Sequence, residues 1–159
     1  MRIIVFSDSH NNYFALRDIV LAQPEAEAFL HLGDGCKEFD YLASNFPLQI
    51  MKGLRGNCDW GMPGNTQAVI ELAGKRIFYT HGHTFGVKSG LDRLKEAARE
   101  SKSDIALFGH THIATVFYED KIHYMNPGSI DRPQQGKASY GVVDITEAGI
   151  ATFIVEIPG

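Results

Sequence analysis

The sequence predicts an α/β fold in a single domain. Through the first half of the chain, short β-branched runs alternate with segments whose apolar residues recur at helical spacing. The last third is instead a succession of strand-like runs. A length of 159 residues suits one domain with its own hydrophobic core. We therefore expect residues 1–159 to fold as one unit.

The first strand and the first helix have clear boundaries in the sequence. The apolar run at 2–6 ends at a Ser-Asp-Ser loop, which is typical of a buried strand. Asn12 suits the N-cap of the helix that follows, because its side chain accepts a hydrogen bond from the first turn. Leu16 and Val20 share one face of this helix, which ends before Pro24.

The next segment repeats this order. A second strand is expected at 28–32, where an apolar run meets Gly33. A second helix is expected at 38–45, and a third strand at 48–51 ends near Gly53.

The middle of the chain predicts a β-hairpin, then a third helix and more strands. The runs at 69–72 and 76–79 flank Gly74, which favours a tight turn. The segment 91–101 places its apolar residues on one helical face and precedes a strand at 105–108. The remaining strands are expected at residues 115–118, 121–125, 138–145 and 150–157.

The composition indicates an ordinary soluble globular protein. Apolar residues make up 44% and charged residues 21%, and the net charge of -4 argues against a general nucleic-acid binder. No apolar run approaches the roughly 20 residues that span a bilayer, and the first residues lack the features of a signal peptide. Cys36 and Cys58 form no C-x-x-C pair, so we expect a reducing cytoplasm and no disulfide framework.

Polar side chains follow five of the expected strands, at the point where each strand ends. Open α/β sheets form their ligand crevices at the carboxyl ends of the strands, so we expect these side chains to share one edge. Each position taken alone is compatible with an ordinary turn; it is their coincidence that indicates a site. They are Asp8, Asp34, Asn57, His81 and His110.

Two more histidines extend this set. Residues i and i+2 of an extended segment point the same way, so Asp8 with His10, and His110 with His112, are each expected to face one point. Imidazoles and carboxylates without thiolates suit Mn, Fe, Zn or Ni. Seven protein ligands exceed the needs of one ion and predict two divalent ions, an arrangement that clamps a phosphate and activates water.

At this point the sequence resembles the calcineurin-like metallophosphoesterases, and its short length is similar to that of their small single-domain bacterial and archaeal phosphodiesterases. The ordered motifs run from residue 8 to residue 129 and cover most of the chain. They are Asp8-x-His10, Gly33-Asp34, Gly56-Asn57-x-Asp59, His81, Gly109-His110-x-His112 and Asn126-Pro127-Gly128-Ser129.

The resemblance implies a four-layer α/β/β/α sandwich, in which two stacked mixed β-sheets are flanked by helices, and a dinuclear metal centre. It assigns one ion to Asp8, His10, Asp34 and His112, and the other to Asp34, Asn57, His81 and His110, with Asp34 bridging. Other polar residues are expected outside this ligand set: His83 as pocket lining, His31 as a satisfied buried histidine, His123 and Arg132 as uninvolved, and Gly128 and Ser129 as a supporting turn.

The expected reaction is hydrolysis of a phosphate ester, foremost a diester, by a metal-bridging hydroxide attacking phosphorus in line with the leaving oxygen. Most of the family has a histidine where this chain has Cys58, and that histidine is thought to assist the leaving group. A thiol is a weaker hydrogen-bond donor than an imidazolium and carries no positive charge. Asn57, Cys58 and Asp59 are therefore the expected catalytic segment, with Asp59 in a supporting role.

Two rival functions stay open. A phosphomonoesterase would use the same site, and a non-catalytic protein-binding scaffold would use the same fold, although here every ligand position is filled. We expect a small phosphate ester as the partner, two divalent transition-metal ions with manganese foremost, and no membrane. A homo-oligomer is compatible with the sequence.

Overall fold

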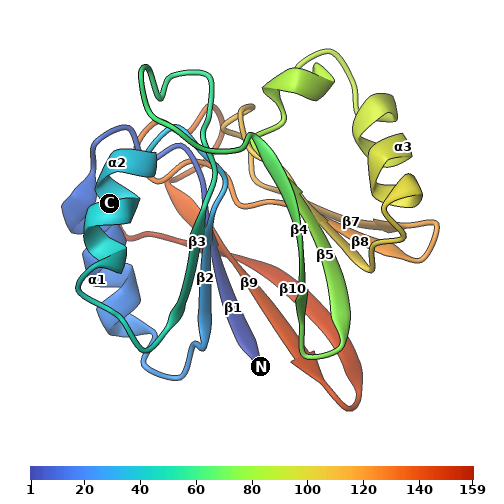
Figure 1. Cartoon of the computed structure of the whole chain (residues 1–159), viewed down its shortest axis with the longest axis horizontal. Helices are drawn as coiled ribbons and strands as arrows, with labels where there is room; N and C mark the ends of the chain where they lie inside the picture. Colours follow the sequence, from blue (N-terminus) through green and yellow to red (C-terminus); the bar gives the residue numbers. More distant parts are fainter.

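Ten strands form two five-stranded sheets that stack face to face (Figure 1). The structure, a computed structural model, describes residues 1–159. The first sheet has the order β10-β9-β1-β2-β3 and the second β4-β5-β6-β8-β7. The first comprises β1 (Arg2–Phe6), β2 (Ala28–His31), β3 (Ile50–Gly53), β9 (Ser139–Thr146) and β10 (Gly149–Glu156). The second comprises β4 (Gln67–Leu72), β5 (Lys75–Thr80), β6 (Ile105–Leu107), β7 (Thr115–Glu119) and β8 (Ile122–Asn126).

Alternation along β1 builds the first two layers. Side chains of a strand point to opposite faces in turn. Ile3 and Val5 belong to the core between the two sheets, whereas Ile4 and Phe6 pack into a second core beneath the helices α1 (Tyr13–Ala22) and α2 (Cys36–Ala43). All four side chains are fully buried, so β1 has apolar contacts on both faces.

The second sheet carries the fourth layer. Helix α3 (Asp92–Glu100) places Leu94 and Ala98 against Phe78 of β5 and Tyr124 of β8, in a third core on the outer face of that sheet. A short 3-10 helix, η1 (His83–Phe85), precedes α3. The expected α/β/β/α sandwich is therefore confirmed.

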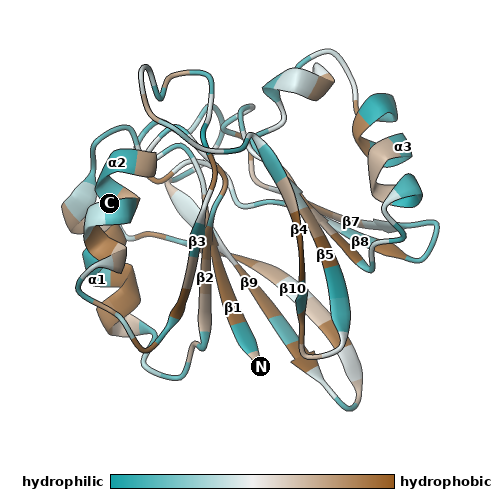
Figure 2. Cartoon of the chain, in the orientation of Figure 1, coloured by the Kyte–Doolittle hydropathy of each residue, from teal (hydrophilic) through white to brown (hydrophobic).

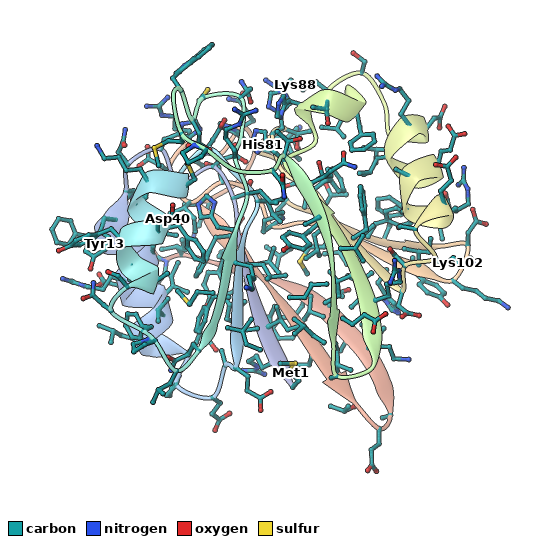
Figure 3. The ribbon with its side chains drawn as sticks, in the orientation of Figure 1. Met1, Tyr13, Asp40, His81, Lys88 and Lys102 are labelled. Atoms are coloured by element: carbon teal, nitrogen blue, oxygen red, sulfur yellow. The ribbon has the colours of Figure 1, made fainter.

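The parallel strands bring their carboxyl ends to one end of the molecule. Strands β1, β2 and β3 are parallel to one another, and so are β5, β6 and β8. Figure 3 shows His81, which follows β5, at the opposite end of the sheets from Met1, which precedes β1. The polar segments that follow these strands therefore gather at one end.

Five boundaries differ from the sequence-based expectation by two residues: both ends of α2, both ends of β3 and the start of β4. Helix α2 begins at Cys36 instead of residue 38, because the Asp59 carboxylate accepts the N–H groups of Gly35 and Cys36 and so supplies the missing cap from outside the helix. Strand β3 begins at Ile50 instead of residue 48, where it pairs with Ala28 of β2. The helix η1 was not expected from the sequence.

The turn between β4 and β5 confirms the predicted hairpin. Leu72 pairs with Lys75, so only Ala73 and Gly74 form the loop, and both have positive φ values of 50° and 75°. Positive φ at both central residues matches the twist of antiparallel strands. Figure 2 shows the hydrophobic residues concentrated along the strands and α1, with mainly hydrophilic loops. None of the helices is both long and apolar enough to cross a membrane.

Candidate metal centre

The five strand-end residues meet at the junction of the two sheets. Asp8, Asp34 and Asn57 follow β1, β2 and β3 of the first sheet, whereas His81 and His110 follow β5 and β6 of the second. Hydrogen bonds across the junction join the sheets: His110 donates its N–H to Asp8, and His81 Nδ1 bonds to the carbonyl of Leu32. The crevice therefore lies between two sheets and not along one.

Left-handed backbone turns aim most of these side chains. Positive φ values of 55°, 42°, 56°, 71° and 59° occur at Asp8, His10, Asp34, His110 and His112. Such values are uncommon for residues other than glycine, and strained positions cluster at functional sites. The extended-segment argument for the i, i+2 pairs is therefore wrong in its geometry, because the chain turns at each of these residues.

One group of donors comprises Asp8, His10 and His112, whose ligand atoms all lie within 4.8 Å of one another. Asp8 Oδ1 lies 3.2 Å from His112 Nε2 and 4.0 Å from His10 Nε2. The two histidine Nε2 atoms are 3.5 Å apart. These distances leave the three donors facing one small volume.

A second group comprises Asp34, His81 and His110, again within 4.8 Å of one another. Asp34 Oδ2 lies 3.4 Å from His81 Nε2, and Asn57 Oδ1 lies 3.0 Å from the same nitrogen. The contact that joins the two groups is Asp8 Oδ1 to His81 Nε2, at 3.8 Å. The two groups therefore adjoin, and Asp34 lies in the second.

The donor set fits divalent cations. Asp8 is fully buried, and its Oδ1 atom has no hydrogen-bond partner although three imidazole Nε2 atoms lie within 4.0 Å. An ionised carboxylate oxygen that is buried without a partner is costly unless a positive charge neutralises it. Nitrogen and carboxylate ligands without a thiolate suit transition-metal ions.

Backbone carbonyls orient two of the histidines. His81 Nδ1 lies 3.0 Å from the Leu32 carbonyl oxygen, and His112 Nδ1 lies 2.7 Å from that of Arg132. A carbonyl only accepts, so each Nδ1 carries the proton and each Nε2 presents its lone pair to the centre. This is the arrangement by which proteins fix metal-binding imidazoles.

Hydrogen bonds also orient the two carboxylates of the centre, Asp8 and Asp34. Asp8 Oδ2 accepts from the Ser7 hydroxyl at 2.6 Å and from the His110 N–H at 3.1 Å, which leaves Oδ1 toward the histidines. Asp34 Oδ1 accepts from the Cys58 N–H at 2.7 Å, which leaves Oδ2 toward His81. In each case one oxygen is anchored and the other is free to bind.

The ionisation of these groups reflects their mutual contacts. Burial would raise the pKa of Asp8, but the neighbouring His112 and His81 and the hydrogen bond from Ser7 outweigh it and hold the pKa below its usual value. Burial lowers the pKa of His81, but Asp34 and Asp8 outweigh it and raise that pKa. Burial and the neighbouring His81 lower the pKa of His110 to about 4. The carboxylates thus favour a nearby positive charge, and His110 stays neutral as a ligand must.

Asp59 supports the centre without facing it. Its Oδ1 atom accepts the N–H groups of Gly35 at 2.9 Å and Cys36 at 3.2 Å. Its Oδ2 atom accepts those of Asp34 at 2.8 Å and Gly56 at 2.7 Å. The carboxylate therefore ties the segment after β3 to the segment after β2 and lies at the positive end of α2.

Cys58 lies on the solvent side of the centre. Its thiol is exposed and contacts the Asn57 amide nitrogen at 3.5 Å. Burial and the nearby Asp34 raise its pKa. The thiol is therefore a neutral group at the rim, and its backbone N–H, which anchors Asp34, is the part that contacts a candidate ligand.

The remaining histidines lie as the sequence suggested. His31 is fully buried between Ser9, 2.9 Å from Nε2, and the N–H of Gly33, 3.1 Å from Nδ1, and burial lowers its pKa to about 4. His83 lies beside His81, with ring centroids 5.2 Å apart, and its buried Nδ1 has no partner. His123 lies in β8 against Tyr118, far along the strand from the centre.

The turn at Gly128 and Ser129 supports the centre from behind. The Ser129 hydroxyl donates to the Asp8 carbonyl at 2.8 Å and accepts the N–H groups of Asp131 and Arg132. Arg132 has an exposed side chain, and it contributes through its carbonyl instead. Gly56 permits the chain to pass close to Asp34, because a Cβ there would lie 2.2 Å from Asp34 Oδ1.

Sequence reasoning missed three supporting groups. Ser7 was treated only as part of a loop, although its position next to Asp8 at a strand end was a usable signal. The carbonyls of Leu32 and Arg132 carried no signal, because every residue has a carbonyl and only the fold selects these two.

Comparison with known proteins agrees with this geometry. Residues 1–148 match the sequence model of the calcineurin-like phosphoesterase superfamily domain. The probable metallophosphoesterase YsnB of Bacillus subtilis is 30% identical over 148 residues, which cover 91% of this chain and 85% of that protein. The phosphodiesterase YfcE of Escherichia coli K12 is 35% identical over 101 residues, which cover 57% of this chain and 50% of YfcE.

Solved structures share the fold. A conserved protein of Streptococcus pneumoniae, described as a predicted phosphoesterase, superposes with a TM-score of 0.77 at 27% identity over 97% of each chain. Vacuolar protein sorting 29 of Cryptosporidium parvum superposes with a TM-score of 0.75 at 16% identity, covering 99% of this chain and 98% of that one, and shows the fold alone.

Proposed function

The chain belongs to the calcineurin-like phosphoesterase superfamily, and from that premise we propose that it is a metal-dependent phosphodiesterase acting on a small phosphate ester. The observation that carries the proposal is the buried, unpartnered Asp8 Oδ1, which faces three imidazole nitrogens at 3.2 to 4.0 Å. We treat residues 1–159 as one metallophosphoesterase domain in the cytoplasm, where the free thiols of Cys36 and Cys58 stay reduced.

Seven side chains would hold two divalent ions. Asp8, His10 and His112 form one group, and His81, His110 and Asn57 form the other. Asp34 is proposed to bridge through Oδ2, because its Oδ1 is already occupied by the Cys58 N–H. Manganese is the proposed ion, with nickel, iron and zinc as alternatives that the same donors accept.

The chain's own groups then position the reaction. Bound ions would lower the pKa of water to about 7 and neutralise charge on the phosphoryl oxygens. Asp8 and Asp34 hold the positive charge in place, and the backbone carbonyls of Leu32 and Arg132 keep the histidine lone pairs aimed at it. The attacking water would give a proton to solvent and bond to phosphorus in line with the leaving oxygen, which would depart with the electrons of its P–O bond and take a proton from solvent where needed; we place the exposed Cys58 on that side.

YfcE is a phosphodiesterase by name, and this supports a diester over a monoester. The net charge of the centre supports it as well: two divalent ions, two carboxylates and one hydroxide would leave a formal charge of about +1, which suits a singly charged diester. A phosphomonoesterase is the closer alternative, and a protein-binding scaffold of this fold the more distant one.

The test compares metal-loaded and chelator-treated protein on bis(p-nitrophenyl) phosphate and p-nitrophenyl phosphate. We expect two ions per chain, loss of at least 100-fold in kcat on chelation, recovery on adding Mn²⁺, and a higher kcat/KM on the diester. Asp8→Asn should lose metal and activity, whereas the exposed Asp18→Asn is the matched control. Equal rates with and without metal would contradict the proposal, and bound metal without hydrolysis would favour the scaffold.

A further inference from the structure

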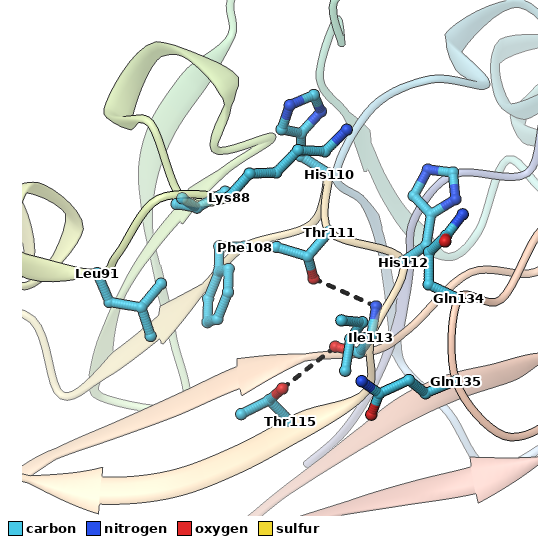
Figure 4. A pocket seen from close by; sticks show the side chains of 11 residues that line it. Lys88, Leu91, Phe108, His110, Thr111, His112, Ile113, Thr115, Gln134 and Gln135 are labelled. Carbon is cyan, nitrogen blue, oxygen red and sulfur yellow. Dashed lines mark hydrogen bonds between the residues drawn. The ribbon is translucent and has the colours of Figure 1, made fainter.

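A pocket of about 640 Å³ opens directly from the candidate metal centre. His110 and His112 form its inner end, and it runs from them along the start of β7 (Figure 4). Specific ligand pockets are typically about 300–1,000 Å³, so this volume suits a substantial organic group. No metal ligand other than these two histidines lines it.

Apolar side chains occur on two facing walls of the pocket. Leu91 and Phe108 lie on one side, and Ile113 and Gln135 lie on the other (Figure 4). Val87 completes the apolar lining. Two opposed apolar walls suit the two faces of a flat ring, because each face of an aromatic ring is apolar and its edge is not.

Polar residues make up the rest of the lining: Lys88, His110, Thr111, His112, Thr115, Gln134 and Gln135. The exposed amides of Gln134 and Gln135 offer both donors and acceptors at the outer rim. A purely aliphatic occupant would form no hydrogen bonds with these amides, and a sugar would place hydroxyl groups against the apolar side chains. The lining therefore favours a flat group with hydrogen-bonding atoms on its edge.

Lys88 supplies the only formal charge in the lining. Its side chain lies beside His110 in the lining of the pocket (Figure 4). No carboxylate lines the pocket, and no ion pair engages Lys88. An unpaired cation beside the two histidines suits a non-bridging oxygen of a phosphodiester.

We propose that this pocket binds the retained group of the diester, the one that stays on phosphorus, and that it selects a flat aromatic group of the aryl or nucleobase kind. The proposal rests on the proposed phosphodiesterase function. We assign the retained group to this pocket because a separate hollow beside Asn57 is available for the leaving group; it is lined by Arg55, Asn57, Trp60 and His83 and shares no residue with this pocket. Leu91 is its specificity-determining residue, and Lys88 binds the phosphoryl group that all diesters share.

The test uses three diesters that share the p-nitrophenolate leaving group: methyl p-nitrophenyl phosphate, bis(p-nitrophenyl) phosphate and thymidine p-nitrophenyl phosphate. Each variant is compared with wild type on the same ester, so the intrinsic reactivity of the ester cancels. The aryl and thymidine esters distinguish the two sources of an aromatic group. Hydrolysis of the methyl ester by metal-loaded wild type tests the proposed function independently of the pocket.

Leu91→Ser should lower kcat/KM about 10-fold on at least one aromatic diester and clearly less on the methyl ester. Leu91 precedes the first residue of α3, where serine is a favourable cap, so the variant should fold. Lys88→Met should raise KM several-fold on all three esters, because each carries one negative charge, and Lys88→Arg should restore it. Leu48→Ser, at a side chain that is 95% exposed, is the matched control.

A binding measurement on metal-free protein, which does not depend on catalysis, completes the test. Titrating metal-free protein with thymidine p-nitrophenyl phosphate should shift the side-chain amide signals of Gln134 and Gln135 in proton–nitrogen NMR spectra, and Leu91→Ser should weaken the shift. The proposal is overturned if Leu91→Ser affects all three esters equally while the protein stays folded. It is also overturned if neither amide signal moves in wild type.

Discussion

Replacing Asp59 with asparagine tests how the centre is held together. The two Asp59 oxygens accept four backbone N–H groups, from Asp34, Gly35, Cys36 and Gly56, at 2.7 to 3.2 Å. Asparagine has one acceptor oxygen and one NH₂ group. Whichever way the amide is oriented, two of the four N–H groups lose their acceptor and face another donor.

The expected loss in the free energy of unfolding follows from these two lost hydrogen bonds. A hydrogen bond to a charged group contributes about 1.5–3 kcal/mol, so two contribute about 3–6 kcal/mol when fully buried. Asp59 is only partly buried, and water can satisfy some of the freed N–H groups, so we expect the lower end, about 3 kcal/mol. In a domain of this size about 1 kcal/mol shifts the Tm by about 2–4 °C, which gives a fall of about 6–12 °C.

The assay is thermal and urea unfolding of metal-free Asp59→Asn, followed by titration with Mn²⁺. We expect weaker metal binding as well, because Asp34 and Asn57 lie on the two segments that Asp59 connects. Asp18→Asn removes an exposed carboxylate that pairs with Arg17 and should change stability by less than about 0.5 kcal/mol. An Asp59→Asn protein as stable as this control, with unchanged Mn²⁺ affinity, would refute the reasoning.

Two further predictions concern Cys58 and His31. Cys58→Ala should change kcat little on aryl diesters, whose leaving groups need no proton, and should lower kcat more on alkyl diesters. Equal large losses of kcat on both would show that the thiol does not act on the leaving group. Burial lowers the pKa of His31 to about 4 from 6.5, so the unfolded chain binds the proton first as the pH falls. Metal-free protein should therefore lose on the order of 3 kcal/mol of stability through this group between pH 6.5 and 4. His31→Gln should flatten that part of the stability curve, and an unchanged curve would count against a buried neutral His31.

The elements of the fold were largely predictable because their signals are local. The alternation in β1, the cap at Asn12 and the hairpin turn at Gly74 each depend on neighbours a few residues away. The start of α2 at Cys36 was not predictable in this way, because its cap is Asp59, 23 residues later in the chain. A boundary set by a distant side chain leaves no periodic pattern to read.

In the candidate metal centre, too, the local sequence indicates the residue types, whereas distant contacts decide how the side chains point. The residue types after the strands indicated metal chemistry, since carboxylates and imidazoles without thiolates bind transition-metal ions. The way these residues point was misjudged at His10 and His112, because left-handed turns and not extended strands aim them. Such turns are sparsely populated, and only the surrounding contacts hold them.

The sequence by itself determined the donor set, the order of the strands and helices, and the likeness to one family of phosphoesterases. Only the tertiary structure decided that the carboxyl ends of two different sheets meet, which brings His10 within 3.5 Å of His112 although they are 102 residues apart. It also decided that Asp8 Oδ1 and Asp34 Oδ2 are the free oxygens, since Ser7 and the N–H groups of His110 and Cys58 occupy the others. The physical reason is that chemical character belongs to each residue, whereas the direction and pairing of a donor depend on contacts between segments far apart in the chain.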